Sequence, residues 1–518
     1  MPSHRLPIRP AILWGLAALA LSLVFAAVTY RSVSPTNDLW DYAQEARQIA
    51  RGEGFTSLYT YPVHLGPDET APFPVRWRMP GYAARGALGI RMGFDPTKLF
   101  FMIAIQAHVA LVVLVFLLGA HFGGPRAGSI AAAAALATPL LLDAYSVGLN
   151  QTPAAALAVL AWLLLIRGNR ARSAVLAAFP AAAAWYLRGE AVLMAPVWIW
   201  AAWRPRSPRR GIAFAVALAL LCLPWPIYMW LTTGVPSSIQ GNPVLLYTPA
   251  YPGYASTRSY LEALPGPVAY VLGHAPHFAF RWIKDVAGFA VDFLGGLGPI
   301  AIGLAMAGLL LREARERYAP LRPALPLIAA IALQIAAFAA LERSPRFLTP
   351  VVPLACVLIG IAAAPALDRF CGRRMVVLLF ALLIGERMAA TAFDVRAAAR
   401  LFPAFPAATA PALTARLAAE APDSSALVLS DVPDWVAWHL DRPALLLTRS
   451  RDLDALLRDH VVAGVFLSPE ARARNLVDGD STWAGWIDRG GPIPGFGAPV
   501  PIPGGARFYP RATSSAYR

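Results

Sequence analysis

The sequence predicts an all-α polytopic membrane protein that ends in a small α/β domain. Three observations predict this class. Hydrophobic residues make up 57% of the 518-residue chain and charged residues only 14%. Apolar stretches recur along most of the chain, and arginines gather in every second connection between them. Soluble domains carry about a quarter charged residues, so a chain this apolar needs lipid as its solvent.

About eleven apolar stretches are candidates for transmembrane helices, and together they predict a membrane domain over residues 1–395. Several are shorter than the roughly 20 residues of a perpendicular span, so their helices must extend into the flanks or be partly shielded. The first is longer than the apolar part of a usual signal peptide, which predicts an uncleaved anchor. The stretches lie near 11–30, 99–119, 128–142, 152–166, 174–187, 190–203, 211–232, 286–311, 323–341, 348–366 and 375–392.

The arginines predict how these spans are oriented. Positively charged residues collect on the cytoplasmic side of a membrane, and here one hand of the alternation holds from the first span to the last. We therefore expect a cytoplasmic N-terminus, a periplasmic C-terminal domain and a bacterial inner membrane. The net charge of +15 then reflects topology and does not indicate nucleic-acid binding. The basic connections contain Arg5, Arg9, Arg126, Arg167, Arg170, Arg172, Arg204, Arg206, Arg209, Arg210, Arg312, Arg315, Arg317, Arg322, Arg369, Arg373 and Arg374.

Three segments are predicted to lie on the periplasmic side: a first loop at 31–98, a second loop at 233–285 and a domain at 396–518. In this domain, apolar runs at 426–429, 444–447 and 462–467 alternate with helical patterns, which predicts a small parallel sheet with helices. The Gly- and Pro-rich end of the chain predicts irregular structure. We expect the polar residues of the domain to cap helices and face solvent, namely Asp431, Asp434, His439 and Asp441.

The first loop opens with two carboxylates, Asp38 and Asp41, at the start of a short predicted helix along the membrane surface. The free amides and the dipole at a helix N-terminus favour a carboxylate, so a capping role explains either residue. A carboxylate at this place can also accept a proton from a reacting hydroxyl. The residue types alone leave both roles open.

Asp38, followed by Tyr42, Ala46 and the run 52–55, resembles the first outer loop of the GT-C superfamily of glycosyltransferases. The nearest resemblance is to the bacterial branch of the dolichyl-phosphate-mannose–protein mannosyltransferases and to the lipid A aminoarabinose transferases. It implies a membrane enzyme that takes a sugar from a polyprenyl phosphate, with Asp38 as the catalytic carboxylate. The family often has a second acidic residue directly after this Asp, where the chain has Leu39, so Asp41 stays open as an alternative. No cofactor is certain; a divalent metal is possible, with its ligands unknown.

Other polar residues at the outer ends of predicted spans fit the same resemblance as substrate ligands. Arg188 and Glu190 resemble the family's Arg-x-Glu element, although side chains at such positions can also be interfacial and reach water. Arg343 and Arg346 run against the positive-inside bias, and a guanidinium fork suits a phosphate. The full set of candidate ligands is Arg78, Gln151, Arg188, Glu190, Arg343 and Arg346.

The sequence therefore predicts a glycosyltransferase that moves a hexosyl or pentosyl group from a polyprenyl-phosphate donor at the periplasmic face. The acceptor would be a lipid, a glycan or a protein, the bilayer a further partner, and the reaction a direct inverting displacement. A transporter or flippase for a lipid-linked or polar solute stays open, as does a non-catalytic membrane scaffold. Transporters tend to show repeated halves and broken helices. The spans here lack a repeat and their polar candidates cluster at one face, which favours an enzyme.

Overall fold

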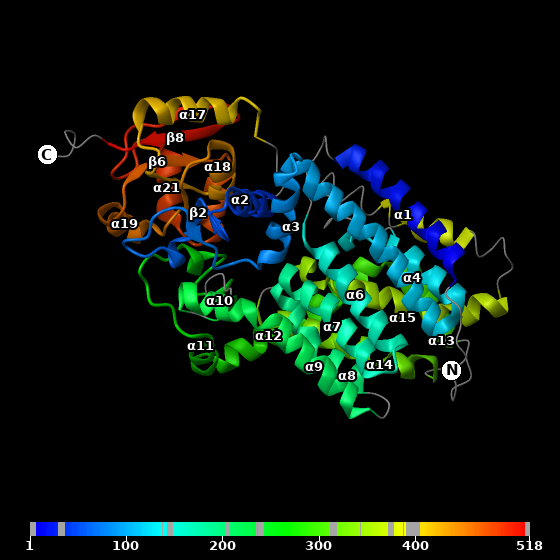
Figure 1. Cartoon of the computed structure of the whole chain (residues 1–518). Coiled ribbons are helices and arrows are strands. Elements are labelled where there is room, and N and C mark those ends of the chain that lie inside the picture. Colours follow the sequence, from blue (N-terminus) through cyan, green and yellow to red (C-terminus); the bar gives the residue numbers. More distant parts are fainter. Residues whose placement is uncertain are drawn as a thin grey trace. The chain divides into compact units, whose positions relative to one another are not determined.

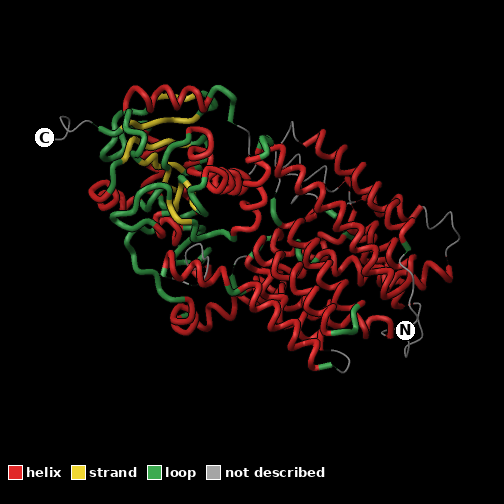
Figure 2. The backbone as a smooth tube through the Cα atoms, viewed as in Figure 1, coloured by secondary structure: helices red, strands yellow, loops and turns green. Residues whose placement is uncertain are grey.

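The computed structural model is mainly helical, and its internal contacts divide the chain into two units (Figures 1 and 2). Unit 1 comprises Met1–Ser34, Thr97–Tyr228 and His277–Pro403, and unit 2 comprises Pro35–Pro96, Met229–Pro276 and Ala404–Arg518. The structure describes residues 7–29, 37–136, 138–141, 149–203, 207–234, 236, 243–310, 319–341, 343–370, 378–386, 388–389 and 405–512.

Some sequence predictions fall outside these described residues. They are both ends of the apolar stretch predicted at 375–392 and several of the topology arginines, namely Arg5, Arg204, Arg206, Arg312, Arg315, Arg317, Arg373 and Arg374.

Unit 1 is a bundle of apolar helices, and wherever the predicted apolar stretches are described they fall mainly on its helices (Figure 2). The helices are α1 (Ile8–Thr29), α4 (Pro96–Leu136), α6 (Gln151–Arg167), α7 (Ala171–Leu187), α8 (Ala195–Trp203), α9 (Pro208–Cys222), α10 (Pro224–Thr233), α12 (Ala275–Leu297), α13 (Pro299–Leu310), α14 (Leu325–Ala339) and α15 (Val352–Phe370). Helix α10 continues into unit 2, and helices α4 and α12 begin there.

Three helical stretches within the described residues are long and apolar enough to cross a membrane: Lys98–Leu136, Pro208–Thr232 and Leu321–Ala339. The bent pair α12 and α13 raises this number to four if it forms one span. Shorter apolar helices cover Ile8–Val24, Gln151–Arg167 and Val352–Pro365. The chain is therefore a multi-pass membrane protein, while the predicted number of spans and their orientation stay predictions.

Helix α4 contains a break where the sequence predicts two separate spans. Gly123 and Gly124 have non-helical backbone angles, and Gly124 lies at a φ of 79°, a conformation that glycine adopts without strain. A side chain at Gly119 would lie 3.1 Å from Gly128 and from Ala131, so the segments before and after the break pack side by side. Small residues permit this close approach of two backbones in a membrane.

The apolar stretch predicted as one span at 286–311 is a broken helix. Helices α12 and α13 meet at an angle of 94°. Gly298, between them, has a φ of 84°, which ends the first helix, and Pro299 begins the second. The predicted span at 286–311 is therefore bent at Gly298, and it stays a prediction that the pair crosses the membrane once.

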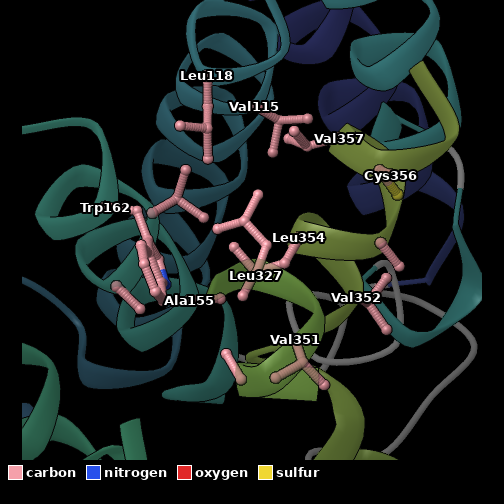
Figure 3. Close-up of a cluster of buried hydrophobic side chains, with 14 of the residues drawn as sticks. Val115, Leu118, Ala155, Trp162, Leu327, Val351, Val352, Leu354, Cys356 and Val357 are labelled. Atoms are coloured by element: carbon pink, nitrogen blue, oxygen red, sulfur yellow. The ribbon is translucent and has the colours of Figure 1, made fainter. Parts of the chain in front are cut away.

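The core of unit 1 combines large side chains with many alanines. Trp162 on α6 packs near Trp198 on α8, with their ring centroids 6.4 Å apart. Figure 3 shows Trp162 among buried aliphatic side chains from several helices, including Val115, Leu118 and Leu354. The alanines at 131–135 are buried, and a side chain at Gly360 would lie 3.0 Å from Ala131, so two backbones approach closely here.

Unit 2 contains a six-stranded sheet with helices around it (Figure 2). Strands β4 (Leu427–Ser430), β5 (Ala444–Leu446) and β6 (Val462–Leu467) are parallel, which confirms the predicted parallel sheet. The strand order is β2-β5-β4-β6-β8-β7. The edge strand β2 (Tyr59–Thr60) comes from the first loop and pairs in parallel with β5, with Tyr59 opposite Ala444.

The end of the chain is more regular than its composition predicts. Strands β7 (Val500–Ile502) and β8 (Ala506–Pro510) form an antiparallel hairpin, so the prediction of irregular structure is wrong there. Gly504 and Gly505 join the strands at φ values of 85° and 78°. Such glycines permit a tight hairpin turn, and strand β8 then extends the sheet beside β6.

The α-helices of unit 2 come from the first loop, the second loop and the C-terminal part of the chain. Those of the first loop are α2 (Asn37–Arg51) and α3 (Pro80–Arg91), which contact each other. The rest are α11 (Pro267–Gly273), α17 (Thr409–Glu420), α18 (Pro433–Leu440), α19 (Leu453–Asp459), α20 (Ala471–Val477) and α21 (Ser481–Arg489). A small pairing of β1 (Thr56–Ser57) with β3 (Phe73–Pro74) closes the first loop.

Candidate active site

Helix α2 carries both predicted catalytic carboxylates, as the sequence predicts. Asp38 lies in its first turn and Arg51 in its last, an arrangement that complements the helix dipole. The helix ends at Gly52, whose φ is 91°, with the Gly52 amide bonded to the Ile49 carbonyl. Apolar side chains on one side bury the helix, so the positions of its carboxylates are fixed by packing: Leu39, Tyr42, Ala43 and Ala46.

Arg78 joins the two carboxylates. Its Nε donates to Asp41 at 2.6 Å and its Nη2 donates to Asp38, so one guanidinium forms ion pairs with both. The guanidinium also lies 5.1 Å from the ring of Tyr42, within cation–π range. Trp77 Nε1 lies 3.3 Å from both Asp41 oxygens. The structure therefore brings Asp38, Asp41 and Arg78 into one cluster, in which Arg78 is occupied by carboxylates.

The two carboxylates differ in their access to solvent. The Asp38 side chain is 22% exposed, whereas the Asp41 side chain is 2% exposed. Asp38 is thus partly open to solvent, whereas Asp41 is covered and contacts Trp77 and Arg78. A general base must come within hydrogen-bond distance of the proton it takes, so the geometry favours Asp38 over Asp41 for that role.

Glu45 is a third carboxyl group of this cluster, and the sequence analysis missed it. It follows Asp41 by four residues, which places both on one face of α2. Glu45 is fully buried, and both carboxyl oxygens lack a hydrogen-bond partner among the described residues. Burial raises the pKa of Glu45 well above its ordinary value, and the charge of Asp41 adds to this effect. The spacing of three acidic residues at 38, 41 and 45 was the available sequence signal.

Two acidic residues expected to face solvent are buried instead. Asp431 follows β4 and accepts hydrogen bonds from the Ser468 amide and hydroxyl. Asp434 lies in the first turn of α18 and is 4% exposed. Burial raises the pKa of Asp434, and the charge of Asp41 adds to it. These residues belong to the interior of unit 2, so the expectation that they are solvated is wrong.

Glu45→Gln is expected to change how the stability of the protein depends on pH. Because the pKa of Glu45 is raised in the folded state, the folded protein keeps a proton on Glu45 that the unfolded chain releases above about pH 4.5. The contribution of Glu45 to the free energy of unfolding is fully present below that pH and is lost as the pH rises toward the pKa of Glu45 in the folded protein. Glutamine stays neutral, so the variant should show a smaller fall in melting temperature between pH 5 and pH 8, measured on the purified protein.

Glu53→Gln is the matched control, since Glu53 is exposed just beyond the end of the same helix. It should follow the wild-type pH dependence. A Glu45→Gln protein whose melting temperature falls with pH as steeply as that of the wild type would contradict the assignment of a neutral, buried Glu45.

A second group of predicted ligands lies in unit 1. Arg188, at the end of α7, forms an ion pair with Glu190 and donates from Nη1 to Asn150 Oδ1 at 3.0 Å. Asn150 precedes α6 and also donates to the Leu187 carbonyl at 2.6 Å. Gln151, the next residue, is buried and its Oε1 lacks a hydrogen-bond partner among the described residues. The structure thus joins Arg188 with Glu190, and Asn150 is a polar contact that the sequence analysis did not single out.

The two late arginines have different surroundings. Arg343 forms a two-point ion pair with Asp292, at 2.9 Å to each oxygen, and lies over Gly288. Arg346 is exposed, and its guanidinium lies 5.2 Å from the ring of Phe347. The guanidinium of Arg188 lies 5.9 Å from the same ring. Arg188 and Arg346 therefore share one aromatic contact, at Phe347, whereas Arg343 pairs with Asp292.

The described residues contain no group of three or more His, Cys, Asp or Glu side chains arranged to hold a metal ion. In the α2 cluster, oxygens of Asp38 and Asp41 already accept from Arg78. A cation there would have to displace the guanidinium. A divalent metal is therefore implied by the family resemblance alone.

No family model matches the sequence, and no curated protein matches it. Solved structures do match. ArnT from Cupriavidus metallidurans bound to undecaprenyl phosphate superposes with a TM-score of 0.59 at 13% identity, over 97% of this chain and 98% of that chain. The archaeal oligosaccharyltransferase AglB from Archaeoglobus fulgidus, in complex with an inhibitory peptide and a dolichol-phosphate, gives a TM-score of 0.55 at 14% identity, over 97% and 74%.

These matches show the fold, which this chain shares with ArnT and AglB. Both neighbours belong to the GT-C superfamily, and this chain has the GT-C fold over nearly its whole length. The resemblance found in the first loop is thereby confirmed at the level of the fold.

Proposed function

We propose that this protein is a membrane glycosyltransferase that moves a sugar from a polyprenyl-phosphate donor to an acceptor at the periplasmic face of a bacterial inner membrane. One observation carries the proposal: a chain with the GT-C fold holds a partly exposed carboxylate, Asp38, next to a buried carboxylate–arginine pair on the first loop. A base held in place by an ion pair suits proton removal from a hydroxyl.

In this proposal Asp38 accepts the proton of the acceptor as the acceptor oxygen attacks the anomeric carbon. The bond from that carbon to the phosphate oxygen breaks, and the polyprenyl phosphate leaves with the electron pair. Asp41 does not meet the substrate but keeps Arg78, and through it Asp38, in place. Asp38 serves as the base, and the other carboxylates of its cluster, Asp41 and Glu45, are buried, so we propose a single inverting displacement.

For the donor phosphate we propose Arg188 and Arg346, which share the Phe347 ring in unit 1. Guanidinium groups bind phosphate through paired hydrogen bonds and stack on aromatic faces at the same time. Arg188 also forms an ion pair with Glu190. Arg343 is a weaker candidate because both of its contacts go to Asp292.

Replacing these arginines with methionine should separate them. Arg188→Met and Arg346→Met are expected to weaken binding of undecaprenyl phosphate about tenfold or more, since each removes a charged hydrogen bond to phosphate. Arg343→Met should leave binding near the wild-type value. Binding is measured on purified protein by native mass spectrometry with added undecaprenyl phosphate. Loss of binding in Arg343→Met alone would contradict this assignment.

The proposed glycosyltransferase activity is tested by an assay of sugar transfer. Purified protein is incubated with a panel of radiolabelled polyprenyl-phosphate sugars and with envelope lipids, glycans and proteins as acceptors. The expected result is movement of label from the donor lipid to one acceptor class, with the anomeric configuration inverted. Failure of transfer from every donor, with the protein folded, would count against a glycosyltransferase.

A transporter is the second candidate, and one observation favours it: helices α12 and α13 form a broken helix with an angle of 94°, a feature of many transporters. In that case the same labelled lipids should change leaflet in proteoliposomes without any chemical change. Label that crosses the bilayer while still attached to its carrier would support the transporter and contradict the enzyme.

A further inference from the structure

Helix α2 has a second functional face, which points toward the C-terminal part of unit 2. The carboxylates at 38, 41 and 45 share one face, while Trp40, Gln44, Arg47 and Arg51 recur at the spacing of another. Contacts join α2 to α18 in the segment between β4 and β5. The helix that holds the candidate base is therefore held from its other side by a segment far along the chain.

Arg47 makes the central contact of this face. Its Nη1 donates to the Trp438 carbonyl at 2.9 Å and its Nη2 donates to the Ala437 carbonyl at 2.7 Å. These carbonyls lie in the last turn of α18, where helical carbonyl groups lack partners within the helix. The negative end of the helix dipole also favours a cation there. Arg47 thus caps α18 with a side chain from α2.

Two further contacts reinforce this cap. Asp441, which ends α18 at a φ of 52°, accepts from both terminal nitrogens of Arg51 at 2.8 and 2.9 Å and lies 3.1 Å from Arg47. The Trp438 ring stacks on Trp40, with centroids 5.9 Å apart, and lies 4.5 Å from the Arg47 guanidinium. The Arg47 side chain is only 17% exposed, so the contact is largely shielded from water.

We infer that α18 positions helix α2 for catalysis and that Arg47 is the positioning residue through which it does so. The inference rests on the proposed function, because it assigns α2 a catalytic carboxylate. Asp38 and Arg47 are nine residues apart on one rigid helix, so a shift at Arg47 moves Asp38. A displacement of about 1 Å at a catalytic group costs up to roughly 100-fold in rate, even when substrate binding is preserved.

The test compares Arg47→Met with Arg47→Lys and with Arg472→Met. Methionine removes both carbonyl contacts, while lysine keeps a cation and one donor. Arg472 forms an exposed ion pair with Asp488 in the same unit, which makes its substitution a matched control. We expect Arg47→Met to lower kcat about 10- to 100-fold with the KM for the donor unchanged, Arg47→Lys to recover part of that loss, and Arg472→Met to behave as wild type.

A second readout does not depend on activity. Hydrogen exchange of the amides of residues 37–51 should be faster in Arg47→Met than in the wild type, whereas the transmembrane helices of unit 1 should be unchanged. If Arg47→Met does not fold, Asp441→Asn replaces it. That variant weakens the ion pairs to Arg47 and Arg51 but leaves both carbonyl contacts, so it should produce the same changes at smaller amplitude.

The outcomes separate the two claims. Arg47→Met or Asp441→Asn with wild-type kcat and wild-type exchange in α2 would overturn the positioning role and leave the proposed function standing. A fall in kcat matched by an equal rise in KM for the donor would also overturn it. A wild-type protein that transfers no sugar, yet shows faster exchange in α2 after Arg47→Met, would confirm the contact and contradict the enzyme.

Discussion

Asp38→Asn is expected to lower the rate of sugar transfer by about 10²- to 10⁴-fold, the usual contribution of a general base. Asparagine keeps the size of the side chain but cannot take a proton. Because the proposed phosphate ligands are arginines elsewhere in the chain, binding of undecaprenyl phosphate should be preserved. The measurement is the initial rate of transfer by purified protein, with donor binding and melting temperature followed in parallel.

Asp41→Asn and Asp488→Asn are the comparisons. Asp41 is buried against Arg78 and Trp77, so its substitution should lower stability and reduce the rate less than Asp38→Asn does. Asp488 forms an exposed ion pair, so Asp488→Asn should leave both the stability and the rate of transfer unchanged. If Asp41→Asn abolishes transfer and Asp38→Asn does not, Asp41 is the base. If neither affects the rate, the carboxylate cluster is not the active site.

Arg78→Met is expected to cause the largest loss of stability among the substitutions considered. Arg78 pairs with Asp38 and Asp41, and its side chain is 20% exposed while that of Asp41 is 2% exposed. Methionine would leave Asp41 buried and charged without a cation. Removing one partner of a buried ion pair costs about 3–5 kcal/mol. The melting temperature of the purified protein should fall accordingly, and transfer should fall with it.

The cause of that loss can be tested with a double variant. If the unpaired charge of Asp41 is responsible, then Asp41→Asn should recover part of the stability lost in Arg78→Met, giving a coupling energy between the two sites. Arg472→Met again serves as the control. An Arg78→Met protein with the wild-type melting temperature, or a double variant less stable than Arg78→Met alone, would show that Arg78 does not neutralise Asp41.

The sequence predicts those features of this protein that depend on local pattern. Apolar stretches predict the helices of unit 1, and apolar runs between helical patterns predict β4, β5 and β6. Buried positions are occupied by apolar residues that recur with the period of the helix or strand, so the sequence alone indicates them. The helix around Asp38 was likewise predicted. Arg78 was predicted only as a substrate ligand, and its ion pairs with Asp38 and Asp41 were not predicted. Glu45 was not, because a carboxylate four residues after another on a helix is most often solvated, and only tertiary packing buries it.

Features that depend on distant partners were beyond the reach of local pattern. Strand β2 has two residues and becomes a strand only because β5 pairs with it. Asp434 looks like an ordinary surface residue in the sequence, but it is buried in unit 2, where α18 packs against α2. The hairpin of β7 and β8 is a different case, because its paired glycines are a turn signal that composition alone conceals.

The pairing of the first loop with the C-terminal strands has a consequence for the biogenesis of the protein. Arg47 and the Ala437 carbonyl that it caps are 390 residues apart in the chain. At synthesis rates of about 5–20 residues per second, the first loop leaves the ribosome roughly 20–80 s before its partner exists. During that time α2, which carries the candidate base, lacks its partner α18, and strand β2 lacks its partner β5. Docking of α2 against α18 is therefore among the last events of maturation, so a chain truncated before residue 437 should insert its helices yet lose most of its transfer activity.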